Sequence, residues 1–113
     1  MSRKAGAQAE EQVRDWLVGQ GLTFVSQNYH SRFGELDLVM RDTDIWVCVE
    51  VKARRHSRYG NAAEQVSASK IKKLHVTFEQ YILAQGINPY HTAMRIDVVA
   101  LTDNKMQWIK NIA

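Results

Sequence analysis

The chain has 113 residues, of which 45% are hydrophobic and 24% are charged, and these proportions are typical of one soluble globular domain. No window approaches 18 unbroken apolar residues, so the composition excludes a membrane-spanning helix, and a net charge of +3 permits a nucleic-acid partner without requiring one. The N-terminal residues are not followed by the apolar stretch of a secretory signal, and the single cysteine, Cys48, cannot form an internal disulfide. We therefore expect a cytoplasmic protein.

The first predicted element is a helix from Ser2 to Gln20, because apolar residues recur there at helical spacing. The residues of this stripe are Ala9, Val13, Trp16 and Leu17. Glu10 lies at the edge of the stripe, about 100° round the helix from its neighbour. The helix pattern alone favours an exposed glutamate at this position, and the alternative is a carboxylate that extends over the core boundary toward a sheet.

A β-hairpin is predicted next along the chain, after a strand at residues 22–31. Two apolar runs, Leu36 to Met40 and Ile45 to Val51, flank the polar residues 41–44. Side chains alternate across a strand, so the first run directs Leu36, Leu38 and Met40 to one face and Glu35, Asp37 and Val39 to the other. The second run directs Ile45, Val47, Val49 and Val51 to one face and Trp46, Cys48, Glu50 and Lys52 to the other.

The predicted hairpin brings two carboxylates together. With a turn at residues 43–44, Asp37 lies directly opposite Glu50, and a turn centred on residues 42–43 moves Asp37 one diagonal away. Either turn places Asp37, Glu50 and Lys52 on one face. Carboxylates about 5 Å apart between their Cβ atoms repel each other unless a cation lies between them. Mg²⁺ is suited to this position, because it takes oxygen ligands and often only one or two carboxylates.

Lys52 completes the pattern D-(x)n-E-x-K, in which an ammonium group lies beside a metal held by two carboxylates. Such a site polarises a phosphodiester. The alternative is a solvated hairpin face on which Glu50 and Lys52 form a weak surface ion pair. The apolar residues on both faces of the hairpin favour the metal site, because buried charges require a partner or a metal.

Basic residues are concentrated just after Lys52 and on one flank of a second predicted helix, which runs from Ser67 or Ser69 to Ala84 or Gln85. We expect these residues to contact the phosphates of a nucleic acid, and the alternative is a solvated basic surface. The residues concerned are Arg54, Arg55, Arg58, Lys70 and Lys73.

The C-terminal part is predicted to form an interior strand at residues 93–101 and a last strand at residues 105–109, joined by a turn at Asp103-Asn104. Asp97 is unusual within such an apolar run. We expect Asp97 to pair with Arg95 or another basic neighbour and to take no part in catalysis.

These motifs together resemble the YraN-like family, which is similar to archaeal Holliday junction resolvases and belongs with the restriction-endonuclease-like nucleases. The resemblance spans nearly the whole chain in order, with two departures: Ala9 stands where the family usually has glycine, and Cys48 stands where phenylalanine is more usual. The segments that carry the resemblance are residues 4–6 with 9–10, 34–39, 47–54 and 59–60, followed by Lys70 and residues 95–99.

The resemblance implies an α/β (α+β) fold with a restriction-endonuclease-like core, α-β-β-β-α-β, in which helices flank a mixed central sheet. It implies that Glu10 joins Asp37 and Glu50 as a ligand of Mg²⁺ or Mn²⁺, and that Lys52 is catalytic. The implied function is metal-dependent endonuclease activity, the hydrolysis of phosphodiester bonds in branched or structured DNA, by a protein that acts as a homodimer. The alternative is a nucleic-acid-binding or assembly module whose nuclease-like site is silent.

Overall fold

The computed structural model of the protein describes residues 3–54 and 66–112. No helix in this part of the chain is long and apolar enough to cross a membrane. In chain order the elements are α1 (Arg3–Gly19), β1 (Thr23–Ser31), β2 (Gly34–Asp42), β3 (Ile45–Arg54), α2 (Ala68–Ala84), the 3₁₀ helix η2 (Pro89–His91), β4 (Met94–Thr102) and β5 (Lys105–Ile109).

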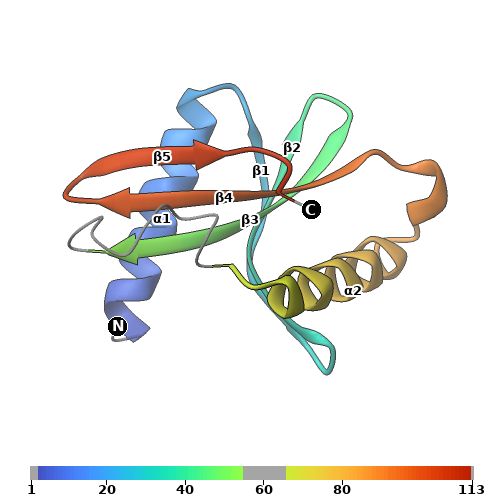
Figure 1. The fold of residues 1–113 in the computed structure, drawn as a ribbon. Coiled ribbons are helices and arrows are strands. Elements are labelled where there is room, and N and C mark those ends of the chain that lie inside the picture. The colour runs from blue at the N-terminus through green and yellow to red at the C-terminus, as the bar shows by residue number, and fades with distance from the viewer. Residues whose placement is uncertain (1–2, 55–65, 113) are drawn as a thin grey trace.

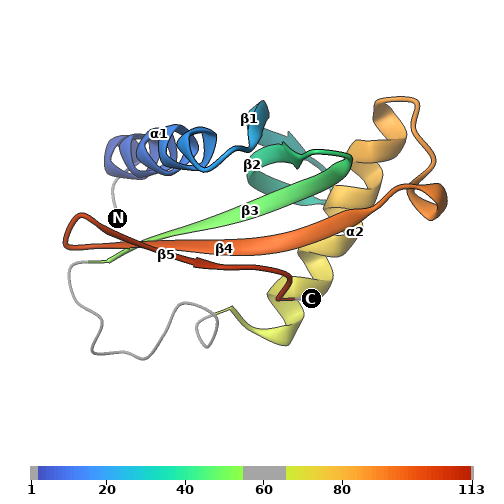
Figure 2. The same ribbon diagram turned by 90° about the horizontal axis from the view of Figure 1, so that it is seen from above.

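One five-stranded sheet contains all the described strands, in the spatial order β1-β2-β3-β4-β5 (Figure 1). Neighbouring strands are antiparallel except β3 and β4, which are parallel and therefore need a crossover connection, supplied by α2. Figure 2 shows α1 and α2 on opposite sides of the sheet. The predicted α+β class, with helices flanking a mixed sheet, is confirmed.

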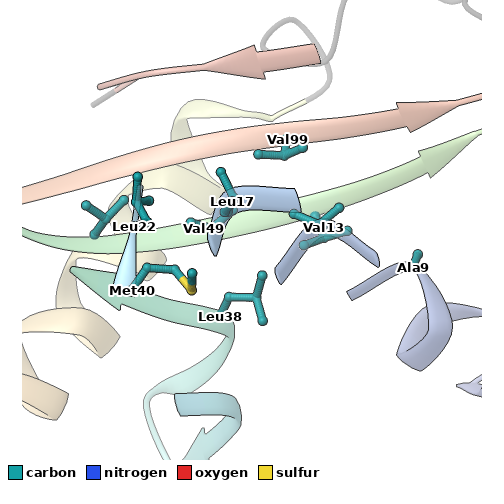
Figure 3. Packing of buried hydrophobic residues seen from close by; sticks show 10 residues of the cluster. Ala9, Val13, Leu17, Leu22, Leu38, Met40, Val49 and Val99 are labelled. Carbon is teal, nitrogen blue, oxygen red and sulfur yellow. The ribbon is translucent and has the colours of Figure 1, made fainter. Parts of the chain in front are cut away.

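The core on the α1 side forms because small and branched residues recur once per turn on the helix face that meets the sheet. Ala9, Val13 and Leu17 are buried against residues of the three central strands (Figure 3). The sheet residues labelled in this cluster are Leu38, Met40, Val49 and Val99. This packing fixes the rotation of α1, so that Glu10, next to the buried Ala9, lies at the boundary between the helix and the sheet.

The core on the α2 side is built from the apolar stripe of the second helix. The helix begins after Ser67, whose hydroxyl oxygen accepts a hydrogen bond from Lys70 N at 3.1 Å, and it ends before Gly86, which takes a positive φ of 79°. The predicted helix bounds are therefore confirmed, with Ser67 as the N-terminal cap. The residues that pack together on this side are Leu36, Val39, Cys48, Leu74, Phe78, Tyr81, Ile82 and Ile96.

The β2–β3 hairpin has its turn at Thr43-Asp44, as one of the two predicted arrangements requires, and Thr43 takes a positive φ of 57°. The ladder between the strands runs only to the pair Leu38–Val49, whereas β2 continues to pair with β1 beyond that point. The prediction that Leu36 shares a face with Leu38 is wrong, because Leu36 packs in the α2 cluster and Leu38 in the α1 cluster. The strict alternation fails in the part of β2 before Leu38, where this strand is not paired with β3 (Figure 1).

Asp97, which is paired with Arg95 within β4, joins this strand to β5 and the C-terminal segment through hydrogen bonds. Asp97 is fully buried and accepts hydrogen bonds at 2.9 Å from Arg95 Nε and Nη2, from Trp108 Nε1 and from the backbone N–H of Asn111. Arg95 Nη1 also donates to Asp42 Oδ2 at 3.1 Å. The predicted pairing of Asp97 with Arg95 is confirmed, and the residue has a structural role.

Candidate metal and nucleic-acid site

Asp37 lies on β2 at the point where β2 leaves β3. Its Oδ2 atom accepts a hydrogen bond of 2.9 Å from the backbone N–H of Val51 on β3. The side chain therefore takes the place of a hydrogen bond between the two backbones. This contact fixes one carboxylate oxygen of Asp37 and keeps the divergence between the strands open.

Glu50 lies beside Asp37 on β3, and its side chain is only 8% exposed. Burial, and after it the negative charge of Asp37, raise the pKa of Glu50 from 4.5 to about 7. The positive charges of Lys70 and Lys52 oppose this rise without cancelling it. Near neutral pH, Glu50 is therefore partly protonated in the folded protein.

Glu10 extends from α1 to the same place. It is half-buried, whereas the adjacent Glu11 is exposed, so the expectation of an exposed glutamate from the helix pattern alone is wrong. Its pKa is raised, first by burial and then by the charge of Asp37, and hydrogen bonds from Gln27 and Asn28 act in the opposite direction. Within the described ranges, the buried Oε2 atom of Glu10 has no hydrogen-bond partner. Glu10 and Glu50 thus approach Asp37 from two different elements.

Two lysines accompany these carboxylates. Lys52, two residues beyond Glu50 on the same strand face, acts on Glu50 through its positive charge. Lys70, in the first turns of α2, places its Nζ atom 3.8 Å from Glu50 Oε2. Lys70 therefore lies beside the carboxylates in the structure. We call Glu10, Asp37 and Glu50 the carboxylate cluster.

The other predicted phosphate contacts are not in the cluster. Arg54 is the last residue of β3 and is half-buried. Arg55 and Arg58 lie outside the described residues. Lys73 lines a groove between α2 and the β1–β2 turn, together with Lys70.

Three residues with a place in the site were not predicted. Gln27 and Asn28 hydrogen-bond to Glu10, and Arg32 lines the groove with Lys73. The strand β1 has an irregular register between Phe24 and Ser26, and Asn28 takes a positive φ of 56°, so alternation along β1 gives no guide to these side chains. The only local signal is the tolerance of asparagine for this backbone conformation.

The carboxylate cluster has the chemistry of a hard divalent cation site. Glu10 and Glu50 each interact with Asp37 and have raised pKa values, and a buried oxygen of Glu10 has no hydrogen-bond partner among the described residues. Among the described residues, no three Asp, Glu, His or Cys side chains form a ready metal cage. Mg²⁺ does not require one, because it is usually held by one or two carboxylates and several waters. The carboxylates of Asp37 and Glu50 are oxygen donors of the kind that fits such an ion.

Comparison with known proteins places the chain among bacterial relatives of nearly the same length. A UPF0102 protein of Klebsiella pneumoniae is 41% identical over 111 residues, which cover 98% of this chain and 87% of the relative. A UPF0102 protein of Colwellia psychrerythraea is 41% identical over 114 residues, covering 97% and 88%, and one of Shewanella frigidimarina is 38% identical over 106 residues, covering 94% and 95%. The profile described as "Uncharacterised protein family UPF0102" matches residues 9–101, the span that contains the carboxylate cluster and Lys52. The chain therefore belongs to the UPF0102 family.

Proposed function

We propose that the protein is a Mg²⁺-dependent endonuclease that hydrolyses phosphodiester bonds in branched or otherwise structured DNA. The observation that carries the proposal is the approach of Glu10 and Glu50 to Asp37, with a buried Glu10 oxygen that has no donor among the described residues. Three acids placed together in this way destabilise the fold unless they serve a ligand.

Asp37 and Glu50 would hold the cation, and Glu10 would complete its surroundings from α1. A bound Mg²⁺ supplies polarisation of the phosphodiester and a more acidic water molecule. The Val51 N–H restrains Asp37, so the orientation of this carboxylate is set before any ligand arrives. A group that binds a metal ion directly requires such preorganisation by the backbone if its geometry is to be kept during a reaction.

Lys52 is the residue that we assign to the reacting phosphate. Hydrolysis builds negative charge on the phosphate oxygens, and an ammonium group beside the cluster stabilises that charge. The lysine is also able to orient the attacking water, because its three N–H donors rotate freely. Lys70 approaches Glu50 from α2 and supplies a second positive charge.

Cleavage assays of the purified protein test the proposal. The substrates are a four-way junction, a flap, a single strand and a linear duplex of the same sequence, each incubated with Mg²⁺, Mn²⁺ or EDTA. We expect metal-dependent cleavage of the branched substrates by the wild type. Lys52→Ala should lower the single-turnover rate on the order of 10²-fold and still bind Mn²⁺, because its role is in the transition state. Glu10→Gln should also cleave more slowly.

The matched control is Lys72→Ala, which removes an exposed lysine of α2. It should cleave like the wild type. If the wild type binds these substrates and cleaves none of them with either metal, the nuclease proposal is wrong and the second candidate, a nucleic-acid-binding or assembly module, takes its place. If Lys52→Ala cleaves like the wild type, the lysine is a structural partner of Glu50 only.

A further inference from the structure

A groove of about 390 Å³ lies between the β1–β2 turn and the first half of α2. The turn contributes Ser31, Arg32, Gly34 and Glu35, and the helix contributes Lys70 and Lys73. In Figure 1 this turn, drawn in cyan, projects past α2 on one side of the molecule. We call this feature the turn–helix groove.

The turn–helix groove is positively charged. Arg32, Lys70 and Lys73 line it, against the single carboxylate of Glu35, whose Oε1 atom lies 3.3 Å from His30 Nδ1. Within residues 3–54 and 66–112, neither Arg32 nor Lys73 forms an ion pair with an acidic side chain. Cations that face one groove without acidic partners attract an anion, and phosphate groups are the anions that such arginine and lysine pairs bind best.

The two walls of the groove are in direct contact. A Cβ atom placed on Gly34 would lie 2.8 Å from Thr77 Oγ1 and 3.3 Å from Lys73 Cε, so only glycine allows the turn to approach the helix this closely. The hydroxyl of Thr77 donates to the carbonyl oxygen of Lys73 at 2.9 Å. The stem of Lys73 therefore lies beside the turn.

Lys70 is shared by the groove and the carboxylate cluster. This lysine lines the groove, and its Nζ atom is 3.8 Å from Glu50 Oε2. At the turn, Phe33 is 36% exposed, and the Arg32 guanidinium lies 4.9 Å from the centroid of its ring. An exposed ring paired with a flat cation is a surface on which an unpaired base stacks.

We propose that the turn–helix groove binds backbone phosphates of the DNA strand next to the cleaved phosphate, and that Phe33 stacks on a base of this strand. The location of the cleaved phosphate rests on the proposed function. The groove predicts a preference for substrates with an unpaired strand beside the cleavage point, because a base held in a duplex cannot stack on Phe33.

The test is binding of a fluorescent flap substrate in EDTA, measured by anisotropy at several salt concentrations. Arg32→Gln and Lys73→Gln should each weaken binding several-fold and lower the slope of log affinity against log salt by about one. Glu35→Gln should strengthen binding, because it removes the one acidic group of the groove.

Lys72→Gln, on the same helix but outside the groove, is the matched control and should retain wild-type affinity. Phe33→Ala should weaken flap binding more than binding of a blunt duplex.

Equal losses in Lys72→Gln and Lys73→Gln would overturn the proposal, because overall charge would then explain the binding. Unchanged affinity in both Arg32→Gln and Lys73→Gln would overturn it as well. The assay contains no metal and requires no cleavage, so its outcome is separate from that of the nuclease assay. Asp37→Asn serves as the internal check, since it should abolish cleavage and retain at least wild-type affinity in EDTA.

Discussion

Glu50 shows how strongly a fold can alter one side chain. Its carboxyl group is buried on β3 beside Asp37, and the nearby lysines Lys52 and Lys70 only partly compensate the resulting charge. A carboxylate in such surroundings has a higher pKa in the folded protein, about 7, than its ordinary value of 4.5. The folded state therefore binds this proton more tightly than the unfolded state does.

We expect Glu50→Gln to stabilise the protein at pH 8 in EDTA. The stability associated with the protonated Glu50 is fully present below pH 4.5 and is lost as the pH rises through about 7, whereas glutamine does not titrate. The difference in unfolding free energy between variant and wild type should therefore grow over this interval, to at most about 3 kcal/mol. Urea denaturation at pH 4.5, 6, 7 and 8 measures it.

The control for this experiment is Glu79→Gln, which changes an exposed glutamate of α2. Its effect should stay small and independent of pH. A Glu50→Gln variant that is less stable than the wild type at pH 8 would show that Glu50 is fully compensated by its lysines, and the account of the cluster would be incorrect.

At the level of single residues, the sequence predicts the part of the site that depends on strand alternation. In a hairpin with a short turn of even length, side-chain alternation places Asp37, Glu50 and Lys52 on the same face. The environment of Glu10 does not follow from its helix, since it depends on how α1 is placed across the sheet and on two residues of an irregular β1. Only the family resemblance indicated Glu10.

At the level of elements, the β1–β2 turn and α2 depend on one glycine. Gly34 has a φ of 149°, which L-residues rarely adopt, and a Cβ atom there would meet Thr77 and Lys73 of α2. We expect Gly34→Ala to lower the unfolding free energy by about 1–3 kcal/mol, because strain and steric overlap add at the same position. Thermal denaturation followed by circular dichroism measures the loss.

Gly19→Ala is the matched control for this substitution. Gly19 is the last residue of α1, and no atom lies within 4 Å of the position of its Cβ. The variant should be as stable as the wild type or slightly more stable, since alanine favours a helix. Equal stability of Gly34→Ala and the wild type would mean that the turn moves away from α2 without cost.

The buried pair of Asp97 and Arg95 fastens β4 to β5 and the C-terminal segment. Asp97→Asn keeps the shape of the side chain and removes its charge, which leaves Arg95 with Asp42 as its remaining acidic partner. We expect a loss of roughly 3 kcal/mol in urea denaturation, as is typical when one member of a buried pair is removed. Asp42→Asn should cost less, because Asp42 is one-third exposed. If the two variants lose equal stability, Asp97 contributes no more to the stability of the protein than Asp42 does.

The elements themselves were largely predictable, and the exceptions have a common cause. The bounds of α2 follow from Ser67, the apolar stripe and Gly86, and β5 follows from the turn at Asp103-Asn104. The sheet face on which Leu36 lies was not predictable, because side-chain alternation assumes that a strand is paired with the same neighbouring strands along its whole length. The departure of β2 from β3 is a tertiary feature, and the same departure makes room for Asp37 and Glu50.

At the level of the whole molecule, the carboxylate cluster is assembled from three elements that are distant in the sequence. Glu10 comes from α1, Asp37 from β2 and Glu50 from β3, and Lys70 approaches from α2 on the other side of the sheet. The two apolar cores hold these elements in place, and Figure 3 shows residues of the core on the α1 side. We propose that this assembly holds a divalent cation.

The most direct test is a Mn²⁺ titration of the protein without DNA at pH 8, followed by calorimetry. The wild type and Asp15→Asn, which changes an exposed aspartate of α1, should bind Mn²⁺ with the same affinity. Asp37→Asn keeps an oxygen that can accept from Val51 N–H, so it should remain folded and bind Mn²⁺ on the order of 10-fold more weakly or worse. Mn²⁺ should also raise the melting temperature of the wild type and not that of Asp37→Asn. Identical heats and melting temperatures for the wild type and Asp37→Asn would contradict the account.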